Sequence, residues 1–382
     1  MVEQSRVSVP LPQGSCDMRL GQGALDRLGA DLHVVVGRPR ACGLAFEQGE
    51  EPELVERCRR LLTDAGFLVS PMPFEASSLR RLDAASRAFA TLAAEGLTGD
   101  DALVAVGGRD LLSLASFVAG AWCSGMVLAF VATTQEACVV SPMSPRPLDV
   151  GDLRSCVAVA GFPRVLVADP DAISASEGVP GARAAMLQTA VADSDAALDV
   201  LSAHLDQLAA GEWDAVCEQL GDTARRRGRI ASSTSVAIRQ SLEYGLTFAR
   251  GLSRLLGPDA DAARVLAEGM RFEGRLAVAV EGTAPDFAFA QDEMLDALGL
   301  APVPASLDPD ELLEACKGEA FCRSNRFLPA LPLAVGRVRR TTVPDELLSE
   351  HLDAWCAAHA RLDASTPNQP RRKEEPCHWT RS

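Results

Sequence analysis

The chain has 382 residues, of which 47% are hydrophobic and 23% charged, a balance that excludes global disorder. This length is sufficient for two domains, each with a buried core. The net charge of −15 repels nucleic acid unless a local basic patch outweighs it, and the arginine clusters are short. We therefore predict no nucleic-acid partner.

The first 170 residues alternate between strand-like and helix-like segments. Each helix shows apolar residues at helical spacing, and each strand is a short apolar run. In chain order we predict a strand at His33–Gly37, a helix at Pro52–Gly66, a strand at Phe67–Pro73, a helix at Leu82–Glu95, a strand at Ala102–Gly108, a helix at Leu111–Trp122 and a strand at Met126–Thr134. This alternation indicates βαβ units in a parallel sheet, so residues 1–170 are predicted to form an α/β, Rossmann-like domain.

Strand signals nearly vanish beyond residue 171. Segments such as "GARAAMLQTAVADSDAALDVLSAHLDQL" carry helical periodicity, so we predict an all-helical domain over residues 171–364. Residues 365–382 are polar and interrupted by prolines, which is typical of a disordered tail.

The sequence carries no sign of export or of membrane insertion. The N-terminal residues lack a basic start followed by an apolar run, which argues against a signal peptide. The most apolar stretch, Met126–Thr134, is too short to span a bilayer. The 11 cysteines include no C-x-x-C pair, as expected for reduced thiols. We expect a cytoplasmic protein without membrane contact.

A glycine pair lies between the predicted strand and helix in "AVGGRDLLSLASF". The start of a helix has unpaired N–H groups and a partial positive charge, so a phosphate group can bind there. Gly107 and Gly108 would let a pyrophosphate approach the backbone. The steric demand of a tight turn explains glycines equally well, and this stretch alone does not decide between the two.

Four stretches, in order, resemble 3-dehydroquinate synthases. The similarity lies in "VAVGGRDLLSLASFVAGAWCSGMVLAFVATT", "RQSLEYGLTFARGL", "AEGMRFEGRLA" and "LPALPLAVGRV", and it extends from about Asp17 to Ala360. The resemblance implies an NAD-binding Rossmann-like domain followed by a helical domain that holds a divalent metal, usually zinc. It also implies a lyase of the shikimate pathway for aromatic amino acids, and commonly a dimer.

The family's NAD-binding positions are partly kept. Gly107, Gly108, Thr133 and Thr134 match the family's pattern, and Arg109 replaces a third glycine. A bulky arginine could either block the pyrophosphate or bind it. The resemblance therefore implies NAD as a cofactor, bound by these five residues.

The family's metal ligands are absent. The positions of its glutamate and two histidines carry Ala184, Leu246 and Ala262. A catalytic zinc needs about three protein ligands and one open position. We therefore expect no zinc.

The substrate positions have changed as well. Arg146 and Arg154 stand where the family has lysines, and Arg239 matches a family arginine. Glu243 and Arg250 replace a helix asparagine and a histidine. Arginine binds anions but substitutes poorly for a lysine that releases a proton. Arg146 and Arg239 are the predicted catalytic residues, acting as substrate contacts.

The five histidines do not suggest a rebuilt metal site. His351 and His359 are eight residues apart in a helical stretch, and we predict that both lie at the surface. His378 follows Cys377 near the end of the chain, with too few partners for a metal.

Three interpretations stay open. The chain is a pseudoenzyme that binds a small molecule or a partner, as a homodimer or paired with a homologue. Alternatively, it is a metal-free cyclase acting on an apolar acidic substrate, because the lost ligands leave an apolar site with arginines at its rim. Finally, it is an active 3-dehydroquinate synthase with relocated ligands.

Overall fold

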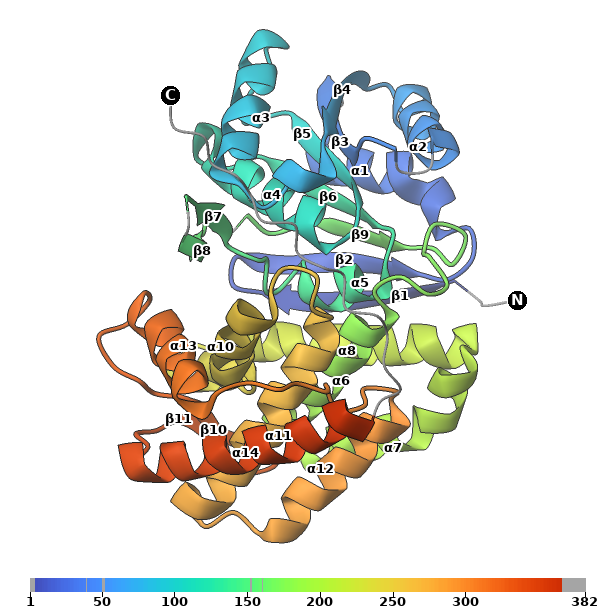
Figure 1. The fold of residues 1–382 in the computed structure, drawn as a ribbon. Coiled ribbons are helices and arrows are strands. Elements are labelled where there is room, and N and C mark those ends of the chain that lie inside the picture. Colours follow the sequence, from blue (N-terminus) through green and yellow to red (C-terminus); the bar gives the residue numbers. More distant parts are fainter. Residues whose placement is uncertain (1–3, 39, 50–51, 152, 160, 366–382) are drawn as a thin grey trace, which may run out of the picture.

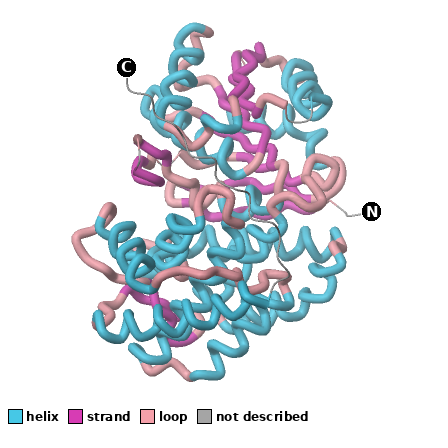
Figure 2. Tube along the Cα trace, viewed as in Figure 1, coloured by secondary structure: helices cyan, strands magenta, loops and turns pink. Residues whose placement is uncertain are grey.

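The computed structural model describes residues 4–365, except residues 39, 50–51, 152 and 160, as two stacked layers (Figure 1). One layer contains a twisted sheet with helices on both faces, and the other is built almost entirely of helices (Figure 2). The tail predicted for residues 365–382 lies, after its first residue, outside the described part.

The sheet has seven strands in the order β1-β2-β9-β6-β5-β3-β4. β1 is antiparallel to β2, and the other neighbouring pairs are parallel. The strands are β1 (Ser5–Leu11), β2 (Gly14–Leu20), β3 (Ala41–Glu47), β4 (Leu68–Phe74), β5 (Ala102–Gly107), β6 (Val127–Ala132) and β9 (Val165–Ala168). The helices of this layer are η1 (Ala24–Arg27), α1 (Leu28–Val36), α2 (Pro52–Asp64), η2 (Ala76–Ser78), α3 (Leu82–Ala94), α4 (Arg109–Ala121), η3 (Trp122–Ser124) and α5 (Gln135–Val140).

The central strands are apolar along both faces because helices cover both sides of the sheet. Leu103 and Phe130 point into one core, whereas Val104 and Val131 point into the core on the opposite face. Parallel sheets are typically buried in this way. The predicted α/β fold is confirmed.

The second layer consists mainly of helices. They are α6 (Val179–Asp193), α7 (Asp195–Ala210), α8 (Trp213–Ala231), α9 (Val236–Gln240), η4 (Ser241–Glu243), α10 (Leu246–Leu256), α11 (Ala262–Glu281), α12 (Pro285–Ala297), α13 (Pro309–Phe321) and α14 (Asp345–Ser365). Two small hairpins complete the fold, β7 (Leu148–Val150) with β8 (Leu153–Val157), and β10 (Ala330–Ala334) with β11 (Arg337–Arg340). The domain boundary at residues 170 and 171 stays a prediction.

The strand predicted at His33–Gly37 is wrong, because these residues close helix α1. Leu28 and Leu32 lie four residues apart and are fully buried, whereas Val34 is 80% exposed. Helical spacing of the leucines therefore outweighs the β-branched run. The true strand, β3, begins at Ala41.

Helices α10 and α11 approach each other very closely at two glycines. A Cβ added to Gly269 would lie 1.8 Å from the carbonyl oxygen of Gly245, and Gly245 itself has a φ of 81°. Beside this contact, the rings of Phe248 and Phe272 stack with centroids 4.1 Å apart. The absence of side chains at the two glycines therefore fixes where α10 begins.

A buried carboxylate holds the start of α10. Glu273, on α11, accepts hydrogen bonds from the N–H groups of Gly245 at 2.7 Å and of Thr247 and Phe248 at 3.0 Å each. These donors have no partner within the first turn of the helix. Burial raises the pKa of Glu273 to about 8, against the lowering effect of the three N–H groups. Glu273 thus retains its proton through most of the neutral range.

We predict that Gly269→Ala lowers the free energy of unfolding by about 2–4 kcal/mol, because backbone atoms must move to admit the methyl group. Gly318 of α13 is the matched control, since the nearest atom to an added Cβ is the Arg254 Nη1 at 3.6 Å. Gly318→Ala should raise stability by about 0.5–1 kcal/mol through helix propensity. Urea unfolding measures both, and equal effects of the two substitutions would contradict the close contact.

Glu273 also predicts a pH dependence of stability. Its pKa is raised in the folded chain from an ordinary 4.5 to about 8, so its contribution to stability is complete below pH 4.5 and is lost as the pH rises to 8. Glu273→Gln keeps an acceptor oxygen but places an amide donor near the Gly245 N–H. We expect a cost of about 1–3 kcal/mol at pH 5.5.

The difference between the wild type and Glu273→Gln should shrink from pH 5.5 to pH 8 in urea unfolding. Glu281 on the same helix is the control, because its hydrogen bond to Arg339 lowers its pKa, so Glu281→Gln should shift stability equally at both pH values. A constant difference for Glu273→Gln would disprove the raised pKa.

Candidate functional site

The glycine turn lies at the carboxyl end of β5, where α4 begins. Gly108 is the N-cap of α4 with a φ of −80°, which any residue adopts. A Cβ added there would meet only the Cγ2 atom of Thr134, at an ordinary 3.7 Å. Neither the backbone nor protein packing therefore requires glycine at this position. A ligand that approaches the backbone here, such as a pyrophosphate, fits the bare turn.

The two threonines lie on the neighbouring strand end. The N–H of Thr133 donates to the carbonyl oxygen of Gly107 at 3.1 Å. The hydroxyl of Thr134 accepts from the Ala137 N–H at 3.2 Å and thereby caps α5. The structure thus brings Gly107, Gly108, Thr133 and Thr134 together at one edge of the sheet.

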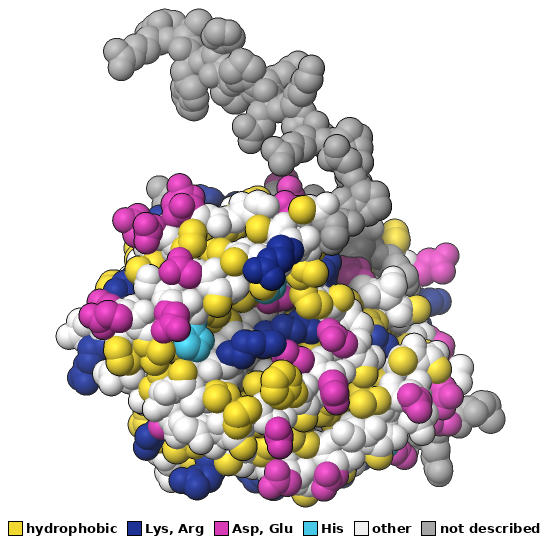
Figure 3. All heavy atoms as spheres, turned by 60° about the horizontal axis from the view of Figure 1, so that its bottom comes forward, with side chains coloured by type: hydrophobic (Ala, Val, Ile, Leu, Met, Phe, Trp, Pro, Cys, Tyr) yellow, Lys and Arg dark blue, Asp and Glu magenta, His cyan; other side chains and the backbone are white. Residues whose placement is uncertain are grey.

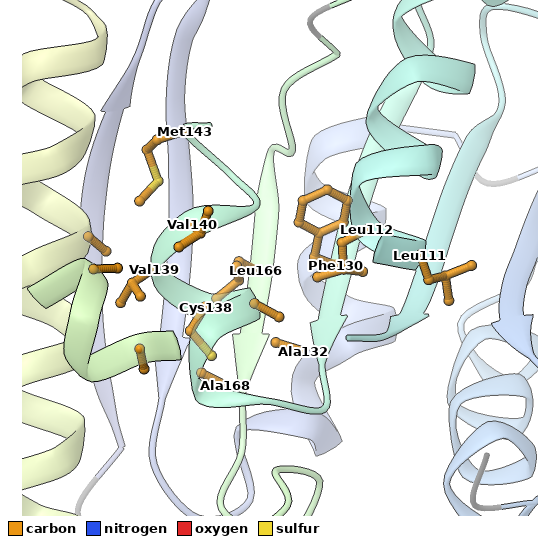
Figure 4. Close-up of a cluster of buried hydrophobic side chains, with 14 of the residues drawn as sticks. Leu111, Leu112, Phe130, Ala132, Cys138, Val139, Val140, Met143, Leu166 and Ala168 are labelled. Atoms are coloured by element: carbon orange, nitrogen blue, oxygen red, sulfur yellow. The ribbon is translucent and has the colours of Figure 1, made fainter. Parts of the chain in front are cut away.

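A cluster of buried apolar side chains lies between α4, α5 and the sheet (Figure 4). Leu111 and Leu112 of α4, Phe130 of β6 and Val140 of α5 belong to one buried core. Val140 is 4% exposed within that core. This position is therefore part of the packing and has no polar atom to offer a ligand.

Arg109 is engaged in an ion pair that the sequence did not suggest. Its Nη1 lies 2.5 Å from the Oε1 of Glu136, in the first turn of α5. The Glu136 carboxyl group packs on Gly181 of α6, where an added Cβ would come within 2.6 Å of its Cδ. The side chain of Arg109 thus reaches from the glycine turn toward α5 and α6.

Arg146 lies close to the same turn, and its role at the site stays a prediction. Its Nη1 is 2.9 Å from the Oδ1 of Asp110, and its backbone N–H donates to the Ser113 hydroxyl at 2.9 Å. Burial, followed by the charge of Arg109, lowers the pKa of Arg146 to about 10. Its guanidinium therefore stays charged at neutral pH.

Among the described residues, Arg239 makes no contact with the residues around the glycine turn. It lies on α9, is exposed, and donates to the carbonyl oxygens of Ser233 at 2.6 Å and Thr234 at 3.2 Å. These bonds close the loop in front of its own helix. Its role as a substrate contact stays a prediction.

A further arginine of the site was missed. Arg227 of α8 is 5% exposed and donates to the side-chain oxygens of Gln188 and Thr189, each at 3.0 Å. Gln188 in turn donates to the carbonyl oxygen of Tyr244 at 2.7 Å. Burial, followed by the charge of Arg109, lowers the pKa of Arg227 to about 10. The "RRR" run at residues 225–227 was the available signal, because it places one arginine on the buried face of a helix.

The three positions of the family's metal ligands lie on three helices. Ala184 is fully buried in α6, Leu246 is the half-buried first residue of α10, and Ala262 is the exposed first residue of α11. Their side chains have no donor atom for a metal. Across the described ranges, no three His, Cys, Asp or Glu residues form a group that could hold a metal ion. The residues present do not fit a zinc ion.

The predicted surface location of His359 is wrong. This histidine is 8% exposed, its Nε2 lies 3.0 Å from the Oε2 of Glu268, and its ring stacks on Trp355 at 3.8 Å. Burial would raise the pKa of Glu268, but the hydrogen bond and charge of His359 outweigh it and hold the pKa below its ordinary value. The pair is a buried structural contact between α11 and α14. His351 is partly exposed, and His378 lies outside the described residues.

The face of the protein seen in Figure 3 carries both acidic and basic side chains, without a large patch of one charge. Acidic, basic and apolar side chains are interspersed there. In the part of the chain that the structure describes, no helix is long and apolar enough to cross a membrane.

Comparison with known proteins places the fold. No family model matches the chain. It is 21% identical over 366 residues to the 3-dehydroquinate synthase of Rippkaea orientalis (strain PCC 8801 / RF-1), covering 90% of this chain and 96% of that protein. It is 26% identical over 292 residues to that of Arthrobacter sp. (strain FB24), covering 66% of this chain and 78% of that protein.

Two solved structures share the fold. A 2-deoxy-scyllo-inosose synthase complexed with carbaglucose-6-phosphate, NAD+ and Co2+ has a TM-score of 0.79 at 16% identity, covering 92% of this chain and 99% of its own. The 2-epi-5-epi-valiolone synthase ValA from Streptomyces hygroscopicus subsp. jinggangensis 5008, with NAD+ and Zn2+ bound, has a TM-score of 0.75 at 15% identity, covering 91% and 98%. The resemblance drawn from the four stretches is therefore confirmed: the chain is related over most of its length to 3-dehydroquinate synthases and has the fold of the sugar phosphate cyclases.

Proposed function

We propose that this protein binds NAD and a small anionic molecule but does not catalyse the metal-dependent formation of 3-dehydroquinate. The observation that carries the proposal is the absence of any donor atom at Ala184, Leu246 and Ala262. A role in the cytoplasm as a homodimer, or paired with an active homologue, is part of this proposal.

The parent chemistry needs groups that this chain lacks. A metal polarises hydroxyl and carbonyl oxygens, and a group that gains and loses a proton assists the elimination of phosphate. The chain has Arg146 where the family has a lysine, and its guanidinium is held by Asp110. An arginine with a pKa of about 10 binds an anion well and transfers protons poorly at neutral pH.

The glycine turn supports the binding of NAD. The backbone of Gly107 and Gly108 and the first N–H groups of α4 would hold the pyrophosphate, with Thr133 and Thr134 beside it. When bound, NAD supplies a hydride acceptor. Because Glu136 holds the Arg109 side chain toward α5 and α6, we propose that Arg109 leaves the place over Gly108 open.

A metal-free enzyme acting on an apolar acidic substrate is the second candidate. Leu246 is half-buried and lies four residues before Arg250, on the same face of α10. An apolar surface beside a cation suits a ligand with an acidic end.

We predict no phosphate release from the family's seven-carbon phosphorylated keto acid, with NAD present and with zinc or cobalt added. The physical reason is the missing ligand set, since a metal in solution has no place beside the substrate. Phosphate is measured continuously, circular dichroism verifies that the protein is folded, and an active 3-dehydroquinate synthase serves as the positive control. Metal-dependent turnover would overturn the proposal in favour of an active enzyme with relocated ligands.

A second prediction concerns NAD. Gly108→Ala should weaken NADH binding by about tenfold or more. The added methyl group would meet the ligand and not the protein, and a tenfold loss of affinity corresponds to about 1.4 kcal/mol of binding free energy. NADH fluorescence gives the affinity, and urea unfolding should show stability unchanged within about 0.5 kcal/mol.

Glu136→Gln provides the companion measurement for Arg109. If the ion pair with Glu136 holds Arg109 clear of the glycine turn, the neutral glutamine of the Glu136→Gln variant should change the affinity for NADH severalfold. Phosphate release should stay at zero in this variant. Equal affinities for NADH in Gly108→Ala and the wild type, with both proteins folded, would refute this location for the cofactor.

A further inference from the structure

Arg250 differs from the other arginines of the chain. It lies on α10, is partly buried, and makes no hydrogen bond or ion pair to any residue that the structure describes. The other arginines whose side chains have no such partner, within the described ranges, are exposed to solvent. Enclosing a cation without a counter-charge is costly. Burial, followed by the charge of Arg323, lowers the pKa of Arg250.

The carboxylates around Arg250 are already engaged. Glu319 lies 2.9 Å from the Nη1 of Arg323 and 3.6 Å from the Nη1 of Arg254. Glu243 lies 3.6 Å from the Nε of Arg340. Each of these acids therefore has a basic partner other than Arg250.

The third neighbouring acid, Glu273, is turned to the backbone. Its two oxygens accept from three N–H groups at the start of α10, and its raised pKa keeps it mostly protonated at neutral pH. The acids near Arg250, which are Glu243, Glu273 and Glu319, are thus each bonded to other groups, and none forms a hydrogen bond or ion pair with Arg250 among the described residues.

The surroundings of Arg250 are partly apolar. Leu246 precedes it by one turn and is half-buried, and Phe321, at the end of the neighbouring helix α13, is 54% exposed. α10 and α13 pack closely, since a Cβ added to Gly251 would lie 2.4 Å from the Sγ of Cys316. Leu246 therefore provides an apolar side chain on the same helix face as Arg250, and Phe321 is an exposed apolar side chain on the adjoining helix.

We propose that Arg250 docks the carboxylate of an organic acid whose apolar body lies over Leu246. A planar guanidinium fits one carboxylate through two parallel hydrogen bonds. A phosphate dianion would call for further free donors, but Arg323 already donates to Glu319 and, at 2.6 Å, to the carbonyl oxygen of Arg154. The inference rests on the proposed function, in which the site holds a small molecule without a metal, and it names the class of that molecule.

The first test needs no ligand. If Arg250 is an unpaired cation in the free protein, Arg250→Met removes a cost and should raise the midpoint of thermal unfolding. Arg254→Met is the matched control one turn later, because Arg254 is more exposed and only loosely paired at 3.6 Å, so its midpoint should stay unchanged. A lower midpoint for Arg250→Met than for Arg254→Met would overturn the proposal, since Arg250 would then have a structural partner.

The second test uses hexanoate, phenylacetate and inorganic phosphate as probes in isothermal titration calorimetry. We expect the wild type to bind at least one of the two carboxylates more tightly than phosphate. Arg250→Met should weaken that binding tenfold or more, and Arg254→Met should change it less than twofold. The proposal is overturned if neither carboxylate binds, if phosphate binds more tightly, or if both variants weaken binding equally. Metal-dependent phosphate release would defeat the proposed function, whatever these titrations give.

Discussion

The contact between Gly245 and Gly269 is the constraint on which the rest of the site depends. A bare backbone at both positions lets α10 begin directly against α11, and the Glu273 carboxyl group then accepts the free N–H groups of the first turn. Because the start of α10 is held in this way, Leu246 and Arg250 occupy fixed places on one face of that helix. The position of these two side chains therefore follows from the packing of α10 against α11.

The arginines at the sheet edge and those around α10 differ in how they are paired. At the sheet edge, Arg109 and Arg146 are held by Glu136 and Asp110, so the cations near the glycine turn are largely neutralised within the chain. Around α10, the carboxylates are engaged by other arginines or by backbone N–H groups, and Arg250 pairs with none of the residues that the structure describes. The sheet edge and the α10 region therefore differ in the positive charge that a ligand would meet. The first suits a ligand held by the backbone, and the second suits a ligand that brings its own negative charge.

Much of the fold followed from the sequence because most of its elements have clear periodicity. The helices near residues 52–66 and 82–95 and the strands ending at Gly107 and Ala132 are where the apolar patterns predicted them. The segment at His33 failed because five residues are too short to distinguish β-branched strand from helix. The "RRR" run was a signal for Arg227, but Glu136 could not be foreseen as a site residue, because only tertiary packing brings it to Arg109, 27 residues away in the chain. The prediction for His359 failed for the same reason: its burial depends on a partner, Glu268, 91 residues away.

The residues at the positions of the metal ligands and near α10 help to distinguish the loss of metal chemistry from the loss of ligand binding. If the region around α10 had merely become packing, apolar replacement would stabilise it and an enclosed, unpaired guanidinium would be an unnecessary cost. Ala184 and Leu246 fit simple packing, whereas Arg250 is a partly buried cation that forms no hydrogen bond or ion pair with any residue that the structure describes. Donors for a metal and cations for an anion are separable requirements: Ala184, Leu246 and Ala262 have no metal-ligating side-chain atom, while Arg250 supplies a cation. The proposed function, binding without metal chemistry, is consistent with both observations.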